Sequence, residues 1–315
     1  FNVWAINPFG WSSPSDASAG IAPVAAPRSL FASTGIIDYV QVDTTGNATD
    51  FGDLHANGQG GGSGSSTTRA LFFGWDNDTR TRIDTVEIST TGNATDFGDM
   101  SNPRRYNAAL SNNTRTVWGT GDDDTDSVVM EYSTIASAGN AADFGDATVF
   151  AYSNTGTASP TRGIFAAGQT TGSTSSVINT MMYVTIGSTG NATDFGDLTL
   201  ARRTPSGVSN GTRAVFGGGR DSGNSNTNVM DYVTIASTGN ATDFGDLAIG
   251  GFGNNEGSGS STRGIFGPGF GSGSPYVGIA YITIASTGNS TTFGDLTGSN
   301  RYNSMSASNA HGGLS

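Results

Sequence analysis

The chain has 315 residues, of which 35% are hydrophobic, with no cysteine, no lysine and a net charge of −12. The missing cysteines exclude disulfides and thiolate metal sites, and the acidic balance repels the phosphate backbone of nucleic acids. No apolar run approaches the roughly 20 residues of a membrane helix. We therefore expect neither nucleic-acid binding nor membrane insertion.

The first 27 residues do not follow the pattern of the rest of the chain. Residues 1–17 contain an alternating segment, a turn at Gly10 and then the sequence Ser-Ser-Pro-Ser. This segment resembles the last two strands of a fibronectin type III domain; the alternative is an irregular leader. Residues 18–27 are rich in Ala and Pro and predict a linker. Because the chain starts at Phe1 without an initiator methionine, we expect it to belong to a longer protein.

From residue 28 onward the sequence repeats one phrase six times. Each copy has Gly-Asn, two small residues, one further residue and then Phe-Gly-Asp, at intervals of 46 to 51 residues. A period of about 20–50 residues marks a chain built from one supersecondary unit that cannot bury its apolar face alone. The copies centre on Phe51, Phe97, Phe144, Phe195, Phe244 and Phe293.

Each repeat predicts four short strands, which we name a to d in chain order. In the copy with the fullest pattern, strand a spans 203–210, strand b 213–217, strand c 230–237 and strand d 243–247. Valine and isoleucine alternate with threonine and small residues in strand c, which is the two-residue period of a β-strand. No segment has the 3.6-residue pattern of an amphipathic helix, so the sequence predicts an all-β protein.

Four antiparallel strands per repeat make one blade of a β-propeller. We therefore predict a six-bladed β-propeller over residues 28–315, and we expect the repeated phenylalanines to be buried between blades. The order of the phrases resembles the kelch repeat, with Phe where kelch blades usually carry Trp. The chain enters in strand b, so the last strand a, Arg301–Asn309, should pair with Arg28–Ala32 and close the ring.

Two motifs resemble functional sites of other proteins. Asp-Phe-Gly, the magnesium-binding motif of kinases, occurs five times, without a catalytic-loop motif and without any lysine. Asn-x-Ser/Thr would be a glycosylation acceptor on a secreted eukaryotic chain, but here it falls in the predicted c–d turn, where Gly-Asn supplies positive φ. Both motifs are interpreted as structural. The asparagines concerned are Asn47, Asn93, Asn191, Asn240 and Asn289.

The run 121–126 is the candidate metal site. Asp122, Asp124 and Asp126 could supply oxygen ligands to Ca²⁺, although the run lacks the twelve-residue spacing and final glutamate of an EF-hand. The alternative is a solvated acidic loop. We expect no other cofactor.

Catalysis has little support in the sequence. The only histidines are His55 and His311, and nucleophile–base pairs are scarce without Cys or Lys. We expect that the protein is not an enzyme. A carbohydrate-acting enzyme is the alternative, and it predicts carboxylates that converge in the central channel.

In an antiparallel four-stranded blade, the a–b and c–d turns lie on one face and the b–c and d–a loops on the other. The turns hardly change between copies, whereas the loops differ throughout. Loops on a rigid scaffold often carry function, although free loops can also simply drift. We expect exposed aromatic and arginine side chains there, suited to an anionic glycan. The candidates are Trp75, Arg104, Arg105, Arg202, Arg203, Arg220, Phe270 and Tyr276.

Near-identical Gly-Asn-Ala-Thr-Asp-Phe-Gly-Asp-Leu phrases followed by Arg-Arg resemble virion structural proteins of marine tailed phages, especially cyanophages. The resemblance implies an extracellular virion component with other virion proteins as partners. It implies adhesion to a host-surface glycan or protein, as a tail fibre or a capsid decoration. The alternatives are a purely structural spacer or assembly module and a bacterial surface adhesin.

Overall fold

The computed structural model describes residues 6–7, 10–11, 26–56, 60–74, 80–122, 127–248, 257–271, 274–275, 277–298, 301 and 304–314. Every regular element in these ranges is a β-strand. None of the described segments forms a helix that is long and apolar enough to cross a membrane. Near the N-terminus, β1 (Ile6–Asn7) pairs with β2 (Gly10–Trp11) as a two-residue antiparallel hairpin.

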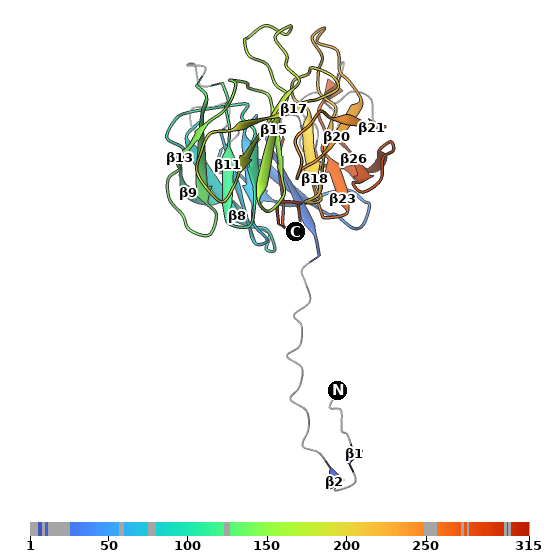
Figure 1. Ribbon diagram of the computed structural model, residues 1–315. Helices are drawn as coiled ribbons and strands as arrows, with labels where there is room; N and C mark the ends of the chain where they lie inside the picture. The colour runs from blue at the N-terminus through green and yellow to red at the C-terminus, as the bar shows by residue number, and fades with distance from the viewer. Residues whose placement is uncertain are drawn as a thin grey trace.

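Six four-stranded antiparallel sheets form the blades of a propeller, and each has the order a–b–c–d (Figure 1). The all-β six-bladed fold predicted from the repeats is therefore confirmed. Blade 1 comprises β28 (Met305–Ser308), β3 (Arg28–Ser33), β4 (Ile36–Gln41) and β5 (Thr49–Asp53); blade 2 comprises β6 (Gly62–Ser65), β7 (Arg69–Phe73), β8 (Arg82–Glu87) and β9 (Thr95–Asp99); blade 3 comprises β10 (Ala109–Ser111), β11 (Arg115–Trp118), β12 (Val129–Thr134) and β13 (Ala142–Asp146).

The second half of the ring repeats this arrangement. Blade 6 has an additional hairpin in its b–c loop, formed by β24 (Phe270–Gly271) and β25 (Ser274–Pro275). Blade 4 comprises β14 (Thr155–Ala158), β15 (Arg162–Ala166), β16 (Thr180–Thr185) and β17 (Thr193–Asp197); blade 5 comprises β18 (Ser206–Ser209), β19 (Arg213–Gly217), β20 (Val229–Thr234) and β21 (Thr242–Asp246); blade 6 comprises β22 (Gly257–Gly259), β23 (Arg263–Phe266), β26 (Gly278–Thr283) and β27 (Thr291–Asp295).

The ring closes within blade 1, where the last strand pairs with the first strand of the repeat region. β28 runs antiparallel to β3, with Met305 opposite Ala32 and Ser308 opposite Ser29. The expected closure between the two ends of the repeat region is therefore confirmed. In Figure 1 the C-terminus lies at the lower side of the ring, the side at which the chain also enters β3.

A β-bulge in strand d explains why the repeated phenylalanines are buried. In blade 4, Met181 pairs with Gly196 and Met182 pairs with Asp194, so Phe195 is the extra residue on β17. A bulge re-aims a side chain, and Phe195 is buried against the edge of Tyr183, with ring centroids 6.1 Å apart. The prediction that these rings are buried is confirmed for all six: Phe51, Phe97, Phe144, Phe195, Phe244 and Phe293.

The c–d turn of each blade docks on strand d of the preceding blade. At the junction of blades 3 and 4, the Gly190 and Ala192 amides donate to the Phe144 and Asp146 carbonyls, both at 2.7 Å. The Asp146 amide donates in return to Oδ1 of Asn191 at 3.0 Å. The other five junctions repeat all three bonds, with serine in place of alanine at one of them.

These bonds correct one detail of the sequence interpretation. Gly190 has a φ of +158°, whereas Asn191 is not among the residues with positive φ. The asparagine is required for its side-chain oxygen, which joins two blades, and not for its backbone conformation. The outer edge of strand d is thereby hydrogen-bonded, although outer strands of a sheet are usually open to another chain.

The arginine that opens strand b links blades at the same side of the ring. Arg162 stacks on Tyr183, with its Cζ 4.4 Å from the ring centroid, and its Nη1 donates to the Ile235 carbonyl of the next blade at 2.9 Å. The remaining bonds are Arg28 to Ile88, Arg69 to Ile135, Arg115 to Ile186, Arg213 to Ile284 and Arg263 to Val42. The arginines in the repeated phrase therefore join neighbouring blades.

Candidate functional site

The two faces of the ring have different roles. We call the side formed by the a–b and c–d turns the turn face (residues 210–212 and 235–241 in blade 5). We call the side formed by the b–c and d–a loops the loop face (residues 198–205 and 218–228 around blade 5). The turn face contains the bonds that repeat at all six junctions, so its sequence is fixed by folding. The loop face also has some bonds between blades, such as that from the Ser153 amide to the Tyr106 carbonyl at 2.7 Å, but its loops differ from blade to blade.

Three consecutive blades carry the same backbone contact on the loop face. In each, one residue of the d–a loop and one residue of the b–c loop exchange two backbone hydrogen bonds and so form an isolated bridge a few residues beyond the end of the a–b ladder. The pairs are Arg105–Asp122 in blade 3, Tyr152–Gln169 in blade 4 and Arg203–Arg220 in blade 5. The fold thus places two facing side chains at one repeated position, which we call the loop-face pair.

The loop-face pairs of blades 3 and 4 are electrically compensated or neutral. Nε of Arg105 lies 2.8 Å from Oδ2 of Asp122, which makes an ion pair. In blade 4, the Gln169 side-chain amide donates to the Tyr152 hydroxyl, and that hydroxyl donates to the Thr171 carbonyl at 2.9 Å. Both arrangements satisfy their polar atoms within the protein.

The loop-face pair of blade 5 consists of two arginines. Arg203 donates to Oε1 of Gln169 at 2.8 Å and to Oδ1 of Asn224 at 2.5 Å. Nε of Arg220 donates to Oδ1 of Asn226 at 3.0 Å. Burial, and then the positive charge of Arg203, lower the pKa of Arg220. Two half-buried guanidinium groups are therefore held next to each other, oriented by neutral amide oxygens.

The candidate calcium ligands are only partly within the described residues. The Asp122 carboxylate accepts from Arg105, whereas Asp124 and Asp126 lie outside the described ranges. No group of three or more His, Asp or Glu that could hold a metal ion occurs in the part of the chain that the structure describes. The calcium site at this loop remains a prediction.

Two of the candidate binding arginines are in the interior, which corrects the expectation that they are exposed. Arg202 is fully buried and forms an ion pair with Asp231, with Nη2 2.8 Å from Oδ2. Burial lowers the pKa of Arg202, and Asp231 opposes that effect. Arg104 is also fully buried, and its Nη1 donates to the Gly119 carbonyl at 3.4 Å. Neither guanidinium can reach a ligand at the surface.

The physical reason is the alternation of side chains along an extended chain. In Arg202-Arg203 the first residue points into the blade and the second toward the loop face. The sequence interpretation treats the doublet as one basic patch, and it misses Gln169, Asn224 and Asn226, which orient the half-buried Arg203 and Arg220. The alternation of side chains along a strand could have shown that the two arginines point to opposite sides. The amides that orient Arg203 and Arg220 lie in loops without a repeated pattern, so no such signal exists for them.

The aromatic candidates are not placed by the structure. Trp75 and Tyr276 lie outside the described residues. Phe270 begins the short strand β24, whose side chains are not described. The structure therefore places the five candidate arginines, whereas the binding site and its aromatic part stay a prediction.

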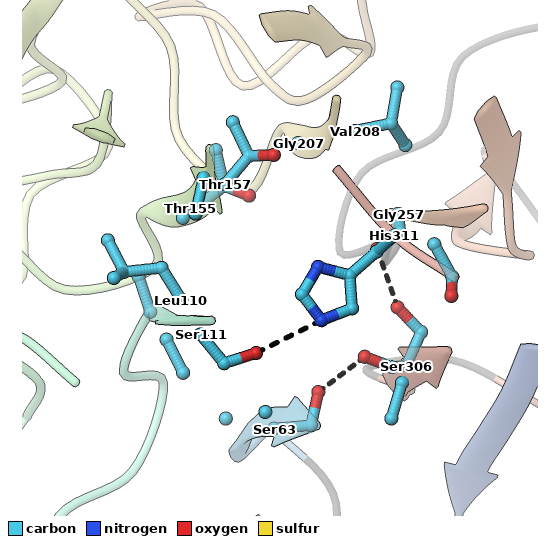
Figure 2. Close-up of a pocket in the computed structure, with 18 of the residues that line it drawn as sticks. Ser63, Leu110, Ser111, Thr155, Thr157, Gly207, Val208, Gly257, Ser306 and His311 are labelled. Atoms are coloured by element: carbon cyan, nitrogen blue, oxygen red, sulfur yellow. Dashed lines mark hydrogen bonds between the residues drawn. The ribbon is translucent and has the colours of Figure 1, made fainter. Parts of the chain in front are cut away.

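A polar channel runs along the axis of the ring, lined by the strand a residues of all six blades (Figure 2). It encloses a cavity of about 70 Å³. Hydroxyl groups join neighbouring inner strands: Ser63 donates to the Ser306 carbonyl at 2.6 Å, and Ser209 donates to the Ala158 carbonyl at 2.6 Å. None of the described residues that line this cavity carries a carboxylate. The carboxylate pair expected of a glycosidase is therefore not present among them.

The C-terminal segment 309–314 closes the channel at the turn face with the side chain of His311. The Gly313 amide donates to Nδ1 at 3.1 Å, so Nε2 carries the ring proton and faces Oγ of Ser111 and the Ser65 carbonyl, both at 3.2 Å (Figure 2). Burial lowers the pKa of His311 to about 4. Both ring nitrogens are used by the protein, so this histidine is a structural group.

No known family model matches the chain. No curated protein matches it either. The case for function therefore depends on the geometry of the ring and its loop face.

Proposed function

We propose that this chain is a non-enzymatic display module that holds its loop face toward a host surface, as part of a virion. The observation that carries the proposal is the position of the chain ends of the ring. The Arg28 amide donates to Oδ1 of Asn309 at 2.8 Å, so the chain enters and leaves the ring at neighbouring points of the turn face. A propeller attached through that face presents the opposite face outward.

The difference between the repeated bonds of the turn face and the varied residues of the loop face supports the same role. The turn face holds the repeated bonds between blades, which leave little freedom to its sequence. The loop face holds residues that differ from blade to blade, including ion-paired, neutral and like-charged loop-face pairs. Variation confined to an outward face is typical of recognition by loops on a rigid scaffold. The resemblance of the repeats to phage virion proteins supports a particle as the setting.

The lack of cysteine in the chain allows a direct test of which face makes contact. Ser222 is exposed in a b–c loop and Ser188 is exposed in a c–d turn, so single cysteines can be introduced at either face. A polyethylene glycol chain attached to each would block one face sterically. The measurement is adsorption of the labelled full chain to host cells.

We expect the conjugate at Ser222→Cys to lose adsorption and the conjugate at Ser188→Cys to keep it. The reverse result would assign the contact to the turn face and overturn the proposal. If neither conjugate changes adsorption, or if the unmodified chain does not adsorb, the propeller acts as a spacer or assembly module instead.

A further inference from the structure

We propose that the Arg203–Arg220 pair is an oxyanion-binding site that captures a carboxylate or sulfate group of a surface polysaccharide. This inference rests on the proposed function, because it names the ligand class of the outward face. Two features carry it: the charge of this loop-face pair compared with its two counterparts, and the way its guanidinium groups are fixed.

The comparison within the ring shows what the fold itself requires at this position. Blade 3 places a carboxylate opposite an arginine, and blade 4 places an amide opposite a phenol. Both satisfy the same backbone geometry without like charges. Like charges directly opposite each other in an antiparallel pair are destabilising. The same backbone bridge therefore forms in the other two blades without a like-charged pair.

The guanidinium groups are also fixed before any ligand arrives. Gln169, which is almost fully buried, and Asn224 each accept a bond from Arg203, and Asn226 accepts one from Arg220. The nearest carboxylate in the sequence, Asp221, accepts the Ser225 amide at 2.9 Å within its own loop. The acceptors in these three bonds are neutral amide oxygens.

Two oriented guanidinium groups suit an oxyanion for a further reason. Planar N–H forks bind carboxylate, sulfate and phosphate oxygens with charge-assisted bonds. Adding an anion between the arginines would also remove the repulsion that helps to lower the pKa of Arg220. The whole chain is acidic, with a net charge of −12, so anion binding has to be local to this pair.

The experiment uses the full chain and three polysaccharide probes: polygalacturonate with carboxylates, dextran sulfate with sulfates, and neutral dextran. Binding is measured by biolayer interferometry at two salt concentrations. The key variant is Arg220→Asp, which copies the ion pair of blade 3 into blade 5. Arg105→Ala is the matched control, because Arg105 already has a carboxylate partner.

We expect the unchanged chain to bind at least one anionic probe, with affinity that falls as salt rises. Arg220→Asp should weaken that binding at least about tenfold, which corresponds to the loss of roughly one charge-assisted bond. Its midpoint of thermal unfolding should be no lower than that of the unchanged chain, because an opposite-charge pair replaces a like-charge pair. The identity of the anionic probe that binds shows whether the natural group is a carboxylate or a sulfate.

Equal binding of neutral dextran, or unchanged binding of an anionic probe by Arg220→Asp, would overturn the site. Loss of binding in Arg105→Ala to the same degree would show a general charge effect and would overturn it as well. The display role is tested separately, by the adsorption of the two cysteine conjugates. If the conjugate at Ser222→Cys blocks adsorption while Arg220→Asp does not, the outward face is correct and the oxyanion site is wrong.

Discussion

Arg263 in the last blade donates a hydrogen bond of 2.8 Å to the backbone carbonyl of Val42 in the first blade. This bond joins the last blade to the first, and it has the same form as the bond at every other junction. Cζ of Arg263 also lies 4.4 Å from the ring centroid of Tyr281. The junction between the last and the first blade therefore has the same contacts as the junctions between consecutive blades.

Replacing Arg263 by alanine should destabilise the protein by about 1.5–3 kcal/mol, because a charged donor to a carbonyl and a cation–π contact are both lost. The measurement is urea-induced unfolding. Glu87→Ala is a suitable control, because the Arg69–Glu87 pair is exposed and its loss should cost at most about 1 kcal/mol. Equal losses in the two variants would contradict a special role for the junction.

Phe195→Ala should cost about 3–5 kcal/mol, from lost transfer free energy and the cavity left behind. Phe195 is 1% exposed and packs within the interface between blades 4 and 5. Equilibrium unfolding in guanidinium chloride measures the loss. Thr193→Ala, an exposed change on the same strand, should stay within about 0.5 kcal/mol. A loss below about 1 kcal/mol for Phe195→Ala would mean that the ring does not fill the interface.

Gly294→Ala should destabilise the ring by about 1–3 kcal/mol, the range for overpacking. A Cβ at this position would lie 2.2 Å from the Gly46 carbonyl oxygen of the docked turn, and backbone cannot move aside. Gly187→Ala is the control, because a Cβ there would have no atom within 4 Å. The comparison uses thermal unfolding of both variants. Similar midpoints would show that the turn can withdraw without loss.

The buried ion pair Arg202–Asp231 can be tested by replacing its two residues with those found at the corresponding positions of blade 4. Arg202→Ala alone should cost about 3–5 kcal/mol, because it leaves Asp231 buried without its charge partner. Blade 4 has Ala151 and Met182 at the corresponding positions, both buried. Adding Asp231→Met to Arg202→Ala should therefore recover much of the lost stability. A double-mutant cycle, with unfolding in urea, measures the coupling free energy between the two positions. Additive losses of stability in the two single variants would contradict the predicted recovery.

Stability should fall as the pH falls from 6.5 toward 4, because of His311. Its pKa is about 4 in the folded protein and 6.5 when exposed, so the unfolded chain binds the proton more readily in that range. The contribution is complete above pH 6.5 and decreases by up to about 3 kcal/mol on acidification. Protonation would also place a hydrogen on Nδ1, where the Gly313 amide donates.

The measurement compares urea unfolding at pH 7 and pH 4.5 for the unchanged chain and His311→Gln. We expect the variant to lose less stability on acidification than the unchanged chain. His55→Gln is the matched control, and it should keep the full pH dependence. If His311→Gln and the unchanged chain show the same decrease, protonation at this position does not contribute.

Much of the fold could be predicted because its determinants recur in every blade. The repeated arginine and the Gly-Asn and Phe-Gly-Asp phrases each make a bond or a contact between neighbouring blades, so the period of the sequence is the period of the structure. The sequence predicts strand b of blade 5 at its observed bounds, 213–217. Strand c ends three residues earlier than predicted, at Thr234, because the following residues turn toward the next strand.

The candidate site could be predicted only in part. The order of strands and loops predicts that Arg203 and Arg220 lie on one face, and the structure pairs their backbones directly. The direction of each side chain in Arg202-Arg203 was missed, because composition counts charges and does not say which way they point. The amides that hold the pair come from irregular loops, where no periodic signal exists.

The uniform contact between blades has a consequence for how the loop face can change. Every c–d turn makes the same bonds to the strand before it, including the turn of the first blade against the last. A whole blade could therefore be exchanged for another from the same ring with its turn-face contacts to both neighbours preserved. Such an exchange would bring a new pair of loops to the outward face in one step. Recombination between repeats could therefore change the loop face while the bonds between blades on the turn face stay the same.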